Sequence, residues 1–281
     1  MNMAATASDF ASGKDHRDEN FPVASIFVRP DCRAPVMAFY RFARLSDDVA
    51  DHPDASPQEK LARLDALQDT IRGHCDSEPS ALALRQVMQA RGVTPSHALD
   101  LLEAFRRDVT KTRYANLGEL MDYCRYSAMP VGRYVLDVHG ESRDLWPAND
   151  ALCAALQIIN HLQDCGKDYR GLDRVYLPLD AMDRAGARVQ DLGSDRASPA
   201  LRSVIGELAS KADMLLQRSH AFSGGIRDRR LAIEVAVIQR LAESLVARLK
   251  RRDPLAGRVR HRRSETLFLA SGAALRRLAG L

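Results

Sequence analysis

The sequence has little of what a β-rich, secreted or membrane-spanning protein needs. Its 281 residues include only 16 glycines and 12 prolines, too few for a chain that makes a tight turn every ten residues or so. The longest charge-free apolar stretch, Ala151–Gln163, is shorter than the roughly 18 residues that a membrane span requires. The N-terminus has neither a basic start nor an apolar core, so no signal peptide is expected.

The cysteine pattern also excludes two classes of small domain, those held together by disulfides and those held together by zinc. The five cysteines are an odd number and never form a Cys-x-x-Cys pair, which fits neither a disulfide framework nor a zinc knuckle. The composition, with 46% hydrophobic and 28% charged residues and a net charge of +4, is that of an ordinary globular protein. We therefore expect a cytoplasmic protein with reduced cysteines.

Apolar residues recur at three- and four-residue spacing along most of the chain, which indicates an all-α protein. Ser56-Pro57-Gln58-Glu59 forms a capping box that starts a helix. A long helix is expected from about residue 117 to 139, kinked at Pro130. Arg174–Pro178 should be a short extended connector, because the residue before a proline avoids the helical region. No internal repeat or low-complexity linker interrupts the pattern, so we expect a flexible arm over residues 1–14 and one domain over residues 15–281.

The first informative motif lies at the end of the first predicted helix. Asp47 and Asp51 are four residues apart and share one helix face, with Asp48 beside them and Arg44 one turn earlier. Like charges at this spacing destabilise an isolated helix by a few tenths of a kcal/mol, and a bound cation would relieve the repulsion. Mg²⁺ typically takes one or two carboxylates, waters and substrate phosphate oxygens. A solvated acidic turn is the competing explanation.

A second polar stripe occurs on a helix that is otherwise rich in apolar residues. Asn160, Asp164 and Asp168 recur every four residues, so their side chains must face water, a cavity or an ion. If this motif is taken alone, an amphipathic helix whose polar face is exposed to solvent is the simpler explanation. Two such stripes on separate helices of one bundle, facing each other across a cavity, would make a carboxylate-lined metal site.

Together the motifs resemble those of the squalene and phytoene synthases. The Tyr-xxx-Arg-xx-Asp-Asp-xx-Asp motif of that family is matched by Tyr40, Arg44, Asp47, Asp48 and Asp51. Its Asn-xxx-Asp-xxx-Asp motif is matched by Asn160, Asp164 and Asp168, and its Arg-x-Tyr-x-Pro segment by Arg174–Pro178. The resemblance extends from about residue 15 to the end of the chain.

The resemblance implies a fold and a set of functional residues. The fold is a single-domain, all-α isoprenoid-synthase helical bundle around a central cavity, and the cofactor is Mg²⁺. The implied metal ligands are Asp47, Asp48, Asp51, Asn160, Asp164 and Asp168. The implied diphosphate contacts are Arg44, Lys167 and Arg174. Of the tyrosines within the motifs, Tyr40 would stabilise positive charge and Tyr176 would help to place a quenching water.

The segment Asp18-Glu19-Asn20 narrows the range of substrates that the resemblance implies. Family members that couple two prenyl diphosphates usually have a cationic Ser-Lys-Ser-Phe-like segment at the corresponding place. Here the segment resembles that of a bacterial subgroup in hopanoid biosynthesis, whose members convert presqualene diphosphate and water to hydroxysqualene and diphosphate. The alternative is that Lys14, His16 and Arg17 supply the same charge.

Two other functions remain open at this point. One is the head-to-head coupling of two farnesyl diphosphates to presqualene diphosphate or a squalene-like product. The other is a non-catalytic scaffold of the same fold, although such relatives usually lose the aspartate pairs that are intact here. The basic residues near the C-terminus lack a nucleic-acid-binding motif; they suit diphosphate or anionic lipid headgroups better. Peripheral contact with the inner membrane face, and contact with the preceding and following pathway enzymes, are therefore the partner interactions we expect.

Overall fold

The protein is described by a computed structural model over residues 7–10 and 28–279. Within these residues the regular secondary structure is helical, with one isolated bridge between Arg113 and Val175, so the predicted all-α class is confirmed. The described chain groups into two compact units, a division that the hydrophobic pattern does not indicate. Of the described residues, unit 1 comprises those within 1–111 and 130–143, and unit 2 comprises those within 112–129 and 144–281.

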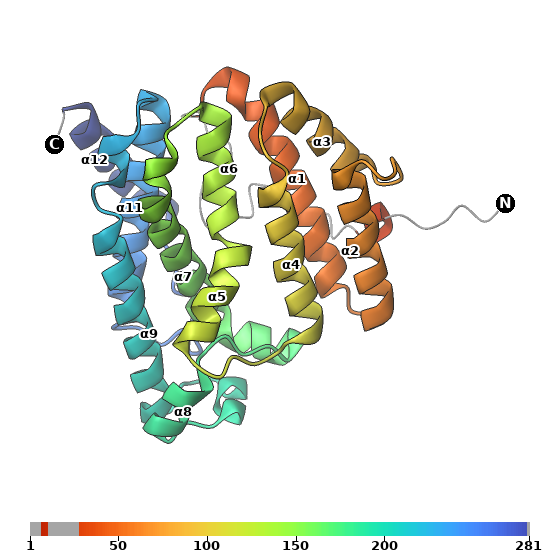
Figure 1. The fold of residues 1–281 in the computed structure, drawn as a ribbon. Coiled ribbons are helices and arrows are strands. Elements are labelled where there is room, and N and C mark those ends of the chain that lie inside the picture. The colour runs from red at the N-terminus through yellow and green to blue at the C-terminus, as the bar shows by residue number, and fades with distance from the viewer. Residues whose placement is uncertain (1–6, 11–27, 280–281) are drawn as a thin grey trace. The chain divides into compact units, whose positions relative to one another are not determined.

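Unit 1 is built from helices that pack around α1. Its helices are α1 (Pro30–Asp51), α2 (Pro57–Arg72), α3 (Pro79–Arg91), α4 (Ser96–Thr110) and α6 (Met129–His139), the last from residue 130 onward. Helix α1 lies against α2, α3 and α4, and α2 lies against α3 and α4 (Figure 1). The first three helices each begin with a proline, whose fixed φ and missing N–H suit the first helical turn. The predicted capping box at Ser56 and Glu59 is present.

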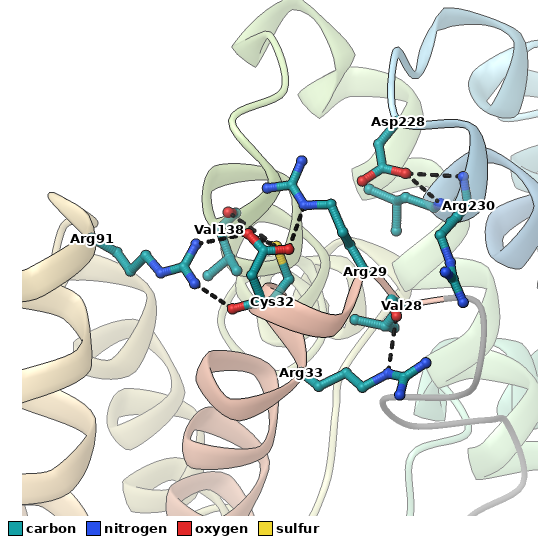
Figure 2. Close-up of polar contacts among 10 residues, drawn as sticks. Val28, Arg29, Cys32, Arg33, Arg91, Val138, Asp228 and Arg230 are labelled. Atoms are coloured by element: carbon teal, nitrogen blue, oxygen red, sulfur yellow. Dashed lines mark hydrogen bonds and ion pairs between the residues drawn. The ribbon is translucent and has the colours of Figure 1, made fainter.

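Several contacts fix α6 and α3 to the first half of α1. The Tyr134 hydroxyl donates to the carbonyl of Pro35 over 3.2 Å, and its ring stacks on Phe39 with 4.1 Å between centroids. The Cys32 thiol lies 3.6 Å from the carbonyl of Val138. Arg91 of α3 donates to the backbone carbonyl and the carboxylate of Asp31, the residue before Cys32 (Figure 2). The N-terminal part of α1 is therefore joined to two helices distant in sequence.

Part of the predicted N-terminal arm packs on unit 1. The 3₁₀ turn η1 (Ala7–Phe10) contacts α1 and α2, and the buried Ala7 N–H donates to the Glu78 carboxylate over 3.1 Å. The Phe10 ring meets His52 edge-on at 4.6 Å. The rest of the arm and the segment Asp18-Glu19-Asn20 lie outside the described residues.

Unit 2 is organised around its longest helix, α7. Its helices are α5 (Leu117–Ser127), α7 (Trp146–Leu172), α8 (Leu179–Ala185), α9 (Pro199–Arg218), α10 (Phe222–Gly225), α11 (Arg229–Leu249) and α12 (Arg263–Leu278). Short 3₁₀ turns occur at η2 (Arg143–Leu145) and η3 (Val189–Gly193). Helix α7 packs on α5, α9 and α11, and α12 packs on α11. The Asp228 carboxylate caps α11 by accepting from the N–H groups of Arg230, over 2.9 Å, and Leu231 (Figure 2).

The helix predicted over residues 117–139 is broken rather than kinked. Helix α5 ends at Ser127 and α6 begins at Met129, so the break precedes Pro130. Proline has no N–H to donate to the preceding turn, and its ring clashes with the carbonyl four residues earlier. It therefore fits better in the first turn of a new helix than in the interior of a continuous one. No helix in the described part of the chain combines the length and apolar character needed to cross a bilayer.

Candidate metal- and diphosphate-binding site

The first acidic motif is organised by an arginine on the same helix. The residues Tyr40, Arg44, Asp47, Asp48 and Asp51 all lie on α1. The Arg44 guanidinium approaches the Asp47 carboxylate at 2.9 Å and the buried Asp48 carboxylate at 2.6 Å. Asp48 is held by a fork of two guanidinium nitrogens, which is a strong, charge-assisted arrangement. One cation therefore pairs with two of the predicted metal ligands.

Asp47 sits among more negative charge than Arg44 neutralises. Partial removal from water, followed by the Asp51 carboxylate, raises the pKa of Asp47 to about 7, and Arg44 opposes this shift. A third acid, Asp108 of α4, also raises this pKa. The Asp47 side chain keeps 35% of its surface exposed, so a cation arriving from solvent could reach it. A crowded carboxylate group that is open on one side suits a divalent cation.

The sequence analysis did not single out Asp108. It is buried on α4 seven residues after Leu101 and four after Ala104, both of which are also buried. An aspartate on the buried face of an amphipathic helix was the available signal, because buried charges are rare without a partner or a function. Asp108 thus adds a carboxylate to the acidic group of unit 1.

The second motif lies on the C-terminal half of α7. Asn160, Asp164 and Asp168 are half-buried, and their four-residue spacing puts them along one side of the helix. Lys167 is exposed. The flanking residues Ile159, Leu162 and Cys165 are buried, as the amphipathic pattern predicts.

A left-handed turn directs the chain from α7 into the predicted connector. Asp173 ends the helix with φ 49° and ψ 35°, a conformation that non-glycine residues rarely adopt. Arg113 holds it by binding the Asp173 carbonyl and, over 2.6 Å, its carboxylate. The Val175 N–H then donates to the carbonyl of Thr112 over 2.9 Å. The connector is therefore non-helical and extended around Val175, as predicted, but it bends at Leu177; both Arg174 and Tyr176 are buried.

Tyr176 belongs to a buried aromatic group within unit 2. Its ring stacks on the imidazole of His161, with centroids 3.6 Å apart and planes 17° apart, and lies 5.5 Å from both Tyr114 and Tyr123. Burial, followed by the Arg174 cation, lowers the pKa of His161 to about 3, so the imidazole is neutral. The amide nitrogen of Gln157 lies 3.1 Å from its Nε2. Aromatic spacing alone did not distinguish Tyr114, Tyr123 and His161 from ordinary core residues.

The structure thus brings the predicted residues together in two sets. Those on α1 belong to unit 1; those on α7 and in the connector belong to unit 2. In the described residues no three His, Cys, Asp or Glu side chains are arranged around a common metal position. The donors are hard oxygen ligands, which fit Mg²⁺ and not a soft metal. Their joint use as metal ligands stays a prediction.

Comparison with known proteins identifies the family. The profile of the squalene/phytoene synthase family matches residues 14–265, which include both acidic motifs and the connector. The chain belongs to the squalene/phytoene synthase family. Hydroxysqualene synthase of Zymomonas mobilis is 57% identical to it over 97% of this chain and 92% of the relative. Hydroxysqualene synthase of Rhodopseudomonas palustris is 52% identical over 95% and 92%.

Solved structures of family members share the fold. A squalene synthase from Alicyclobacillus acidocaldarius superimposes with a TM-score of 0.74 at 31% identity, covering 87% of this chain and 92% of that one. A dehydrosqualene synthase superimposes with a TM-score of 0.81 at 22% identity, covering 98% and 97%. The isoprenoid-synthase fold that the motifs predict is therefore confirmed.

Proposed function

We propose that this protein converts presqualene diphosphate and water to hydroxysqualene and diphosphate in squalene and hopanoid biosynthesis. The observation that carries the proposal is the 57% identity to a hydroxysqualene synthase over nearly the whole of both chains. Both acidic motifs and the Arg-x-Tyr-x-Pro segment are intact. A scaffold that had lost the reaction would have no need to keep these carboxylates.

In this proposal Asp47, Asp48, Asp51, Asn160, Asp164 and Asp168 hold Mg²⁺. The crowding of carboxylates around Asp47, seen in its raised pKa, supports this role. When bound, Mg²⁺ neutralises the charge that develops on the departing diphosphate. Arg44 positions the first two carboxylates through its ion pairs.

We further propose that Arg44, Lys167 and Arg174 contact the diphosphate. Arg174 is buried directly after the left-handed turn at Asp173, so its backbone is fixed before substrate binds. Preorganised cations stabilise a leaving anion more than mobile ones, because they need no reorganisation during the reaction. Lys167 is exposed and supplies charge to an approaching substrate.

The carbon–oxygen bond to the diphosphate breaks, and its electron pair leaves with the diphosphate oxygen, so that a carbocation remains. The cyclopropane ring then opens, and a water oxygen adds to the cation and loses a proton. In the proposal the Tyr40 ring stabilises the positive charge through its π face. The Tyr176 hydroxyl helps to place the water, and its buried aromatic neighbours exclude other water molecules from this region of unit 2.

Two features bear on the cellular setting. All five cysteines are free, which suits a reducing compartment such as the cytoplasm. The substrate is a product of prenyl coupling, and the product is a lipid alcohol. We therefore propose that the protein binds the enzymes that precede and follow it in the pathway.

Product analysis tests the reaction. The purified full-length protein would receive Mg²⁺ without NADPH, with presqualene diphosphate in one tube and farnesyl diphosphate in the other. We expect hydroxysqualene from the first tube alone, and ¹⁸O from labelled water in its hydroxyl group. Consumption of farnesyl diphosphate would establish the coupling reaction instead. Folded protein that is silent in both tubes would favour the non-catalytic scaffold.

A further inference from the structure

The last described helix, α12, exposes an apolar face. The exposed fractions are 69% for Leu267, 79% for Phe268, 67% for Leu275 and 56% for Leu278. At 3.6 residues per turn these four side chains fall within a sector of about 100° around the helix axis. A contiguous exposed apolar face commonly marks an interaction surface.

The opposite side of α12 is fastened to the rest of unit 2. Arg248 of α11 pairs with Glu265 at 3.1 Å, and the Arg277 guanidinium donates to the carbonyl of Ser223 over 3.1 and 3.3 Å. Helix α12 also packs along α11. These contacts fix the rotation of the helix, so the apolar side chains are held outward.

Positive charge is concentrated in the segment of the chain that contains this helix. Residues 248–279 contain ten Lys and Arg but only two Asp and Glu, a net charge of +8, whereas the whole chain carries +4. The remainder of the chain is therefore net negative. Arg263 and Arg276 are both exposed and lie on either side of the apolar sector of α12.

We propose that the outer face of α12 binds the surface of an anionic lipid bilayer. Leu267, Phe268, Leu275 and Leu278 would enter the boundary between headgroups and acyl chains, with the helix lying in the membrane plane. Arg263 and Arg276, which flank the apolar sector, would contact anionic headgroups. A second copy of the chain is a poorer occupant, because a twofold contact would bring two such basic surfaces together.

Vesicle flotation of the full-length protein tests this surface without any substrate, so its result is independent of the proposed reaction. The probes are vesicles of phosphatidylcholine with and without phosphatidylglycerol, at low and high salt. We expect binding to the anionic vesicles and much weaker binding to the neutral ones. The double variant L267S/F268S should bind at least about tenfold more weakly. Because both side chains are exposed, thermal unfolding should match that of the wild type.

The charge contribution is tested by the double variant R263Q/R276Q. Each arginine removed should weaken binding to anionic vesicles about fivefold, so the pair should cost roughly 25-fold at low salt. Matched controls are M214S, which removes an apolar side chain that is 56% exposed on α9, and R72Q/R218Q, which removes two exposed arginines elsewhere. Both controls should bind as the wild type does.

Three results would overturn the proposal. One is equal binding by L267S/F268S and the wild type. Another is a loss in R72Q/R218Q equal to that in R263Q/R276Q, which would mean that net charge alone drives adsorption, or a loss in M214S equal to that in L267S/F268S. The third is a wild-type dimer, seen by sedimentation, that L267S/F268S converts to a monomer, because the face would then join two copies of the chain.

Discussion

The imidazole of His161 stacks on the ring of Tyr176, with 3.6 Å between the two ring centroids. His161 comes directly after a predicted metal ligand on α7, and Tyr176 follows the left-handed turn that ends this helix. The stack therefore joins the acidic motif to the connector that carries Arg174. It gives the neutral His161 a packing contact with the connector that its place in the sequence does not indicate.

Truncation of this imidazole should loosen the aromatic group. We expect His161→Ala to lower the free energy of unfolding by about 3 kcal/mol, because it leaves a cavity beside Tyr176. Urea unfolding followed by circular dichroism measures the change. His220→Ala is the control, since His220 is 81% exposed, and it should change stability little. A loss of equal size in both variants would contradict a packing role for His161.

The hydroxyl of Tyr176 can be tested separately from its ring. Tyr176→Phe keeps the stack on His161, so the fold should be as stable as the wild type to within about 1 kcal/mol. If the hydroxyl places the quenching water, the variant should form less hydroxysqualene and more products that contain no water oxygen. An unchanged rate and an unchanged product ratio would remove Tyr176 from the mechanism.

The acidic motifs predict a large loss of rate without unfolding. Asp48→Asn and Asp164→Asn should each reduce turnover at least about 100-fold, since each removes a charged ligand of the Mg²⁺ that would neutralise the leaving group. Asp54→Asn, in the exposed loop after α1, makes the same charge change and should retain activity. Wild-type turnover by either motif variant would show that the two-motif metal site is wrong.

The raised pKa of Asp47 predicts a pH dependence of the metal-free protein. In the unfolded chain this carboxyl titrates near pH 4, whereas in the folded protein its pKa is about 7. The folded state therefore holds the proton more tightly, and the stabilisation that this provides is present below about pH 4 and lost as the pH rises through 7. With EDTA present, the melting temperature of the wild type should fall relative to that of Asp47→Asn between pH 5 and pH 8.

Added Mg²⁺ should reverse this difference. Binding to the ionised carboxylates stabilises the folded wild type by mass action, so the gain in melting temperature should be larger at pH 8 than at pH 5. Asp47→Asn should gain less at both pH values. A parallel pH response of wild type and variant in EDTA would contradict the crowding of carboxylates at Asp47.

The turn at Asp173 predicts which substitutions the connector tolerates. Asp173→Gly should fold well, because glycine adopts a positive φ freely and the exposed pair with Arg113 contributes at most about 1 kcal/mol. Asp173→Val should cost roughly 1–2 kcal/mol or more, since a β-branched residue is strained in this region. Its activity should fall further than that of Asp173→Gly, because the strain displaces Arg174. Equal melting temperatures for the two variants would show that the left-handed turn does not form.

Local spacing predicted the parts of this protein that depend on neighbours in sequence. The helical positions of Asp47, Asp51, Asn160 and Asp164, the capping box at Ser56 and the extended connector all follow from patterns a few residues long. The relation of the motifs to a known family was also visible, because the motif residues are fixed at short, ordered intervals.

Contacts between distant segments could not be predicted in this way. Asp108 acts on Asp47 from a helix some 60 residues later, and Tyr114 and Tyr123 meet Tyr176 from another part of unit 2. Packing of Ala7 against Glu78 likewise depends on a partner 71 residues away. A single sequence shows that each of these residues can be buried, but not which neighbour it meets.

The order in which the chain builds unit 1 has a consequence for synthesis on the ribosome. Helix α6 is made after α5, which belongs to unit 2, yet Tyr134 completes the core beside Phe39 and Pro35. Until α6 has been synthesised, Phe39 therefore lacks the Tyr134 ring that stacks on it, while residues 112–129 of the other unit are made first. We expect a chain truncated before α6 to be an aggregation-prone fragment rather than an independent domain, because this part of the core of unit 1 is left uncovered.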